Sequence, residues 1–146
     1  FGVFNKLLGS NLSSTFNIKW RIQMASKKTI FVAFAIEDEK QRDMLKGQSL
    51  NTNSPFEYID MSVKKAYDAD WKAKVRTRIK RSDGVIALIS NNSLTSSGQK
   101  WEIKCAREEG KKVLGIWIYK GDRTNIVGVN TKVWTWKAIE DFIDSL

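Results

Sequence analysis

One carboxylate, Glu102, stands where α/β proteins place chemistry. It lies near the start of a predicted helix, directly after an apolar strand and a polar loop over residues 90–97. Strand carboxyl ends and helix amino ends converge at such a junction, and ligands bind there. Glu102 is therefore the first candidate for a catalytic residue. The alternative is a surface acid that stabilises its own helix by about 0.3–1 kcal/mol.

The chemistry open to a single carboxylate is narrow. The chain has no histidine, which excludes Ser-His-Asp and Cys-His catalysis and histidine metal sites. Ordinary glycoside hydrolysis generally needs two carboxylates. One is enough for the nicotinamide bond of NAD, because nicotinamide is already a cationic leaving group and an anion beneath the ribose stabilises the oxocarbenium charge. The same chemistry would serve a deoxyribosyltransferase acting on nucleosides.

Two neighbours of Glu102 on the predicted helix have competing interpretations. Trp101 carries a ring that can stack on a base, but adjacent helical residues diverge by about 100°, so packing in the core is the alternative. Cys105 lies four residues after Trp101 on the apolar side, and we expect it to be a core thiol.

The elements that must position these residues alternate between strand and helix. Continuous apolar runs indicate strands covered on both faces, whereas the half-polar run at 55–61 indicates a strand nearer an edge. The predicted strands cover residues 28–35, 55–61, 84–90, 112–119 and 132–134. The predicted helices run from Asp38 to Leu45, over 70–81, over 97–109, and onward from a capping Thr135. This order predicts a flavodoxin-like parallel sheet of about five strands with helices on both faces.

Composition limits the class of protein further. The 146 residues favour one domain over 28–146, preceded by an arm over 1–27 that packs on the domain or serves self-association or a membrane surface. One cysteine fits a reducing cytosol, and no apolar run reaches the roughly 18 residues of a membrane span. Phosphate-binding and dinucleotide-binding glycine motifs are absent. Ser90, where a phospho-receiver domain needs aspartate, excludes that class as well.

The net charge of +9 favours anionic partners such as nucleotides. Part of the excess is local, because the predicted helix over 70–81 carries a basic run from Lys72 to Arg81 with no acid inside it. A solvated helix face is one interpretation, and a surface that binds phosphate or a partner is the other.

Several stretches together resemble the TIR-like family that includes the TIR protein of bacterial Thoeris anti-phage defence. The resemblance covers residues 28 to about 120. The stretches that carry it are 30–34 (IFVAF), 58–62 (YIDMS), 70–90, 101–103 (WEI) and 110–116 (GKKVLGI). Where members commonly have a tryptophan three or four residues before the glutamate, this chain has Gln99 or Gly98.

The resemblance implies an enzyme that cleaves NAD at the nicotinamide bond, with NAD as substrate and no cofactor or metal. Its catalytic glutamate falls on Glu102. The resemblance implies substrate-binding residues at Phe34, Ala35, Asp38, Asp60, Ser90 and, by ring stacking, Trp101. It also implies a cyclic ADP-ribose-type signal for a separate effector protein, and self-association through the loop at about 60–68.

Two other classes stay open. A non-catalytic TIR-like module would work by binding partners or assembling, with the basic helix and the arm as its surfaces. Nucleic-acid association rests on charge alone and is the weakest of the three, with steep salt dependence as its signature. Only the enzyme makes Glu102 indispensable.

Overall fold

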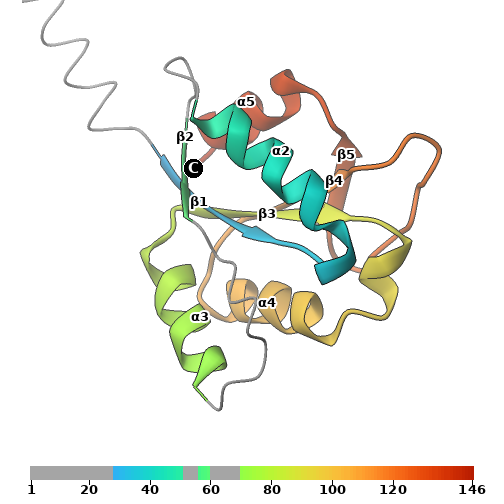
Figure 1. Ribbon diagram of the computed structural model, residues 1–146. Coiled ribbons are helices and arrows are strands. Elements are labelled where there is room, and N and C mark those ends of the chain that lie inside the picture. The colour runs from blue at the N-terminus through green and yellow to red at the C-terminus, as the bar shows by residue number, and fades with distance from the viewer. Residues whose placement is uncertain (1–27, 51–55, 60–69) are drawn as a thin grey trace, which may run out of the picture.

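A five-stranded, all-parallel sheet forms the centre of the protein (Figure 1). The computed structural model describes residues 28–50, 56–59 and 70–146. The strand order is β2-β1-β3-β4-β5, so β2 and β5 are the edges. The strands are β1 (Lys28–Ala33), β2 (Phe56–Ile59), β3 (Gly84–Ile89), β4 (Val113–Trp117) and β5 (Asn130–Val133). The predicted flavodoxin-like sheet and the edge position of the second strand are both confirmed.

Helices cover both faces of the sheet, as predicted (Figure 1). Helices α2 and α5 lie on one face, and α3 and α4 lie on the other. Their bounds are α2 (Glu39–Ser49), α3 (Trp71–Arg81), α4 (Ser97–Glu108) and α5 (Trp136–Asp144). Short 3-10 helices follow two strands, η2 (Ile36–Asp38) after β1 and η3 (Asn91–Leu94) after β3.

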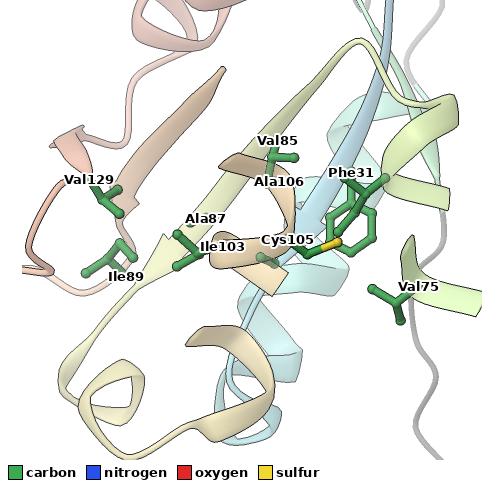
Figure 2. Close-up of a cluster of buried hydrophobic side chains, with 11 residues drawn as sticks. Phe31, Val75, Val85, Ala87, Ile89, Ile103, Cys105, Ala106 and Val129 are labelled. Carbon is green, nitrogen blue, oxygen red and sulfur yellow. The ribbon is translucent and has the colours of Figure 1, made fainter. Parts of the chain in front are cut away.

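Each face of the sheet has its own hydrophobic cluster. On the α3/α4 side, strand residues such as Phe31 and Val85 pack with Val75, Ile103 and Cys105 (Figure 2). This confirms Cys105 as a core thiol. The cluster on the α2/α5 side contains Ile30, Val32, Leu45, Ile86, Leu88, Leu114, Ile116, Ile139 and Ile143. Successive strand residues alternate between the two clusters because side chains alternate along a strand.

The ends of helix α2 differ from the prediction, whereas the start of α5 and the end of α4 agree with it. Helix α2 continues past Leu45 to Ser49, and the Asp38 side chain makes no capping hydrogen bond to it. That carboxylate is engaged elsewhere, as described below. Thr135 caps α5 by accepting a hydrogen bond from the backbone N–H of Ala138, and Gly110 follows α4 with a φ of 70°.

The strand order creates one topological switch point. From β1 the chain passes to β2 on one side, and later to β3 on the other side. In open parallel sheets of this kind, ligands bind at the carboxyl ends of the strands where the order reverses. The β1/β3 junction is therefore where a site is expected.

Some predictions fall outside the described residues, namely the arm over 1–27 and the self-association loop at 60–68. Within the part of the chain that is described, no helix is both long and apolar enough to cross a membrane.

Candidate active site

The side chain of Gln99 lies between the carboxyl ends of β1 and β3 and bonds to both strands. Its Nε2 donates to the backbone oxygen of Ala33 at 3.1 Å and to that of Leu88 at 2.7 Å. Its own backbone N–H donates to the Ser96 side chain, which caps α4. The start of α4 is thus fixed to the carboxyl ends of both central strands, at the topological switch point.

Glu102 follows Gln99 by three residues, so the two side chains lie on the same side of α4. The residue is half-buried, but its Oε2 is fully buried and has no hydrogen-bond partner among the described residues. Burial raises the pKa of the Glu102 carboxyl well above its ordinary value, because the charged form loses its hydration. A positive charge brought beside it would favour the carboxylate again.

The carboxylate of Asp38 also lies at the carboxyl end of the sheet, but unlike Glu102 Oε2 it has several hydrogen-bond partners. It is fully buried and accepts hydrogen bonds from Ser90 Oγ at 2.5 Å, from Asn92 Nδ2 at 2.8 Å and from Tyr119 Oη at 2.8 Å. These donors follow β3 and β4, whereas Asp38 follows β1. One side chain therefore joins the loops after three strands.

Further contacts hold the same loops. Tyr119 also hydrogen-bonds to the Gln41 side chain, and burial together with the Asp38 carboxylate raises the pKa of Tyr119 to about 12. Asp122, in the loop after β4, accepts a hydrogen bond from the backbone N–H of Asn91 at 2.8 Å. Hydrogen bonds from Thr124 and Asn91 lower the pKa of Asp122. The loops at the carboxyl end of the sheet are therefore bonded to one another and to α2.

The aromatic candidates lie on opposite faces of the sheet. The Phe34 ring packs against the α2/α5-side cluster, with the Arg42 guanidinium 4.9 Å from its centroid. The Trp101 ring contacts Trp71 of α3, with centroids 5.2 Å apart and an interplanar angle of 65°. Arg76 lies 5.6 Å from the same ring. Trp101 thus joins α4 to α3, and ligand stacking by it stays a prediction.

The sequence-predicted site residues are partly brought together. Asp38 and Ser90 bond directly, and Ala35 is buried between β1 and η2. Asp60 lies outside the described residues. Sequence reasoning missed Gln99, Asn92 and Tyr119. The position of Gln99, one helical turn before Glu102, was the signal that could have found it.

No group of three or more His, Cys, Asp or Glu side chains that could hold a metal ion occurs in residues 28–50, 56–59 and 70–146. On α4, the side chains at the candidate site are the desolvated carboxyl of Glu102 and, one helical turn before it, the Gln99 amide.

The fold also appears in a solved structure, the Clostridium botulinum CMP N-glycosidase BcmB. The two share 18% sequence identity and superpose with a TM-score of 0.51 over 81% of this chain and 96% of that chain. This likeness concerns the fold. No curated protein matches the chain.

The strand order and the helices on both faces define an α/β domain of the flavodoxin-like class. The model of one family, described as Thoeris protein ThsB, TIR-like domain, matches residues 31–123. The chain belongs to this family, as its motifs indicated.

Proposed function

We propose that this TIR-like domain cleaves the N-glycosidic bond between nicotinamide and ribose in NAD, with Glu102 as the catalytic residue. The observation that carries the proposal is the buried Oε2 of Glu102, which has no hydrogen-bond partner among the described residues and lies on the helix that begins at the β1/β3 switch point. A buried polar atom normally has a partner, so an unpartnered one at a ligand-binding edge points to a ligand.

The chemistry follows from charge. Nicotinamide leaves as a neutral molecule from a cationic pyridinium, so no acid has to protonate it. As the bond breaks, positive charge develops on the ribose ring, and the Glu102 carboxylate stabilises it in a site with few competing waters. The raised pKa of Glu102 fits this order of events, since the incoming pyridinium itself favours loss of the carboxyl proton.

Other parts of the proposal rest on the family. The product is a cyclic ADP-ribose-type signal in the cytoplasm that activates a separate effector in anti-phage defence. The domain self-associates through its TIR surfaces, and NAD contacts include Phe34, Ala35, Asp38, Asp60, Ser90 and Trp101. The N-glycosidase activity of BcmB supports the class of bond, because CMP also joins a base to ribose by an N-glycosidic bond.

The test is nicotinamide release from NAD by wild-type protein and by Glu102→Gln, at high protein concentration to permit assembly. We expect the variant to lose at least about 10²–10³-fold in kcat, the scale of losing one electrostatic stabiliser of a transition state. Lys104→Gln is the matched control, because Lys104 is an exposed residue of the same helix. Equal release by wild type and Glu102→Gln would remove Glu102 from the mechanism.

A second candidate function is a non-catalytic binding module. The observation in its favour is the basic surface of α3, where Lys72, Lys74, Lys80 and Arg81 are exposed. Under this alternative, wild type and Glu102→Gln both release no nicotinamide, and substitutions on α3 alter partner binding instead.

A further inference from the structure

Gln99 has an amide whose orientation is fixed by its surroundings. Both of its Nε2 contacts, the backbone oxygens of Ala33 and Leu88, are obligate acceptors. The NH₂ group must therefore face the strand ends, and Oε1 must face the other way. The residue is only 1% exposed, and rotation of the amide would bring Oε1 against these two carbonyl oxygens, with only the long 3.4 Å bond from Ser93 Oγ left to the Leu88 oxygen.

The Gln99 Oε1 has no hydrogen-bond partner among the described residues. Within the described part of the chain, the buried side-chain atoms in this state are this oxygen and Oε2 of Glu102. They belong to residues one turn apart on the same helix, whose Cβ atoms are about 5–6 Å apart in such pairs. Because the two side chains lie on the same side of α4, one ligand could contact both oxygens.

We propose that Gln99 is a substrate-positioning residue whose side-chain oxygen accepts a hydrogen bond from a ribose hydroxyl of the nucleotide that Glu102 acts on. This rests on the proposed function. Gln99 lies one helical turn from the carboxyl assigned to the reacting sugar, a separation that a single ribose ring can span. The hydroxyl groups of a ribose can donate the hydrogen bond that Gln99 Oε1 does not receive from the described residues.

The position of Gln99 Oε1 is also fixed by the contacts of its residue. The amide is bonded to β1 and β3, and the helix N-terminus that carries it is capped by Ser96. An acceptor fixed in this way loses little freedom when a hydroxyl binds, and it orients the ring relative to Glu102. A sugar that lacks the hydroxyl leaves the oxygen unsatisfied, so Gln99 is expected to set selectivity for that hydroxyl.

The experiment compares NAD with two analogues that lack the 2′ or the 3′ hydroxyl of the nicotinamide-bearing ribose. Binding is measured by calorimetry on the full chain carrying Glu102→Gln, and kcat/KM on the wild type. We expect one analogue to be weaker than NAD by about 10–100-fold. Adding Gln99→Met should reduce that discrimination to within about threefold, whereas adding Lys104→Gln should leave it unchanged.

Discrimination between analogues separates positioning from a purely structural role, because a structural defect weakens all three ligands alike. If NAD and both analogues bind equally, Gln99 does not have the proposed role, and the proposed function still stands. This conclusion needs only the chain carrying Glu102→Gln, so it holds even if Gln99→Met fails to fold. Absence of both NAD binding and nicotinamide release overturns the proposed function and the role of Gln99 with it.

Discussion

At the scale of single residues, the environments of Glu102 and Asp38 separate their roles. Asp38 accepts hydrogen bonds from three side chains, whereas Glu102 has a buried oxygen with no partner among the described residues. A carboxylate whose acceptor sites are occupied by the protein holds loops together, and one with an unoccupied site is available to a ligand. The two carboxyls thus differ in their surroundings, which favours the catalytic role proposed for Glu102 and makes any contact of Asp38 with NAD secondary to its hydrogen bonds within the protein.

The burial of Glu102 predicts a pH-dependent cost in stability. Its pKa in the folded protein lies above its unfolded value, so the folded state holds the proton more tightly. Stability is therefore lost as pH rises from about 4.3, the ordinary glutamate pKa, through the folded pKa. Glu102→Gln removes this loss. Its Tm should exceed that of the wild type by a few degrees at pH 8 and match it near pH 4.

The measurement is thermal unfolding of wild type, Glu102→Gln and the control Lys104→Gln across this pH range. In a domain of roughly 150 residues, 1 kcal/mol corresponds to about 2–4 °C in Tm. A Tm difference between wild type and Glu102→Gln that does not change with pH would show that the Glu102 carboxyl is not desolvated.

At the scale of elements, Gly115 controls how β5 packs beside β4. Gly115 pairs with Thr131, and a Cβ at this position would overlap the Thr131 hydroxyl and lie 2.8 Å from Val129 Cγ1. These are short, branched side chains with little freedom to move. Gly115→Ala should therefore destabilise the fold by about 1–3 kcal/mol.

Gly84→Ala is the matched control for that substitution. Its new Cβ would lie 2.8 Å from Leu146 Cδ2 and 3.3 Å from Phe142 Cζ, but these are the far ends of side chains that can shift. We expect a smaller loss, measured as the difference in urea midpoints at equal slope. A larger loss for Gly84→Ala than for Gly115→Ala would contradict the argument.

The elements were predictable from the sequence because their signals are local. The apolar run of β3, the Thr135 cap and the Gly110 stop depend on neighbouring residues only. Part of the candidate site could be proposed from the sequence, Glu102 from its place after a strand and Ser90 from the family resemblance. The bonds of Gln99 and Asp38 were not predictable, because their partners lie 52 to 81 residues away for Asp38 and up to 66 for Gln99. The prediction that Asp38 caps α2 was wrong for the same reason, because its carboxylate is bonded to residues far away in the sequence.

At the scale of the whole molecule, the domain boundary predicted at residue 28 can be tested directly. Strand β1 begins at Lys28, and the family match begins at residue 31. A chain covering 28–146 should therefore fold cooperatively, with a free energy of unfolding within about 1 kcal/mol of the full chain. Denaturant titration of both chains measures this. A loss of cooperative unfolding on removal of 1–27 would make the arm part of the domain.

The edge strand β5 has a consequence for assembly. It has four residues, Asn130 to Val133, and includes the exposed Lys132. Short strands with lysine resist pairing with the edge of another chain, which is how native sheets avoid uncontrolled aggregation. Self-association of the kind proposed above would therefore use side-chain surfaces, because this edge of the sheet is poorly suited to pairing with a strand of a second copy.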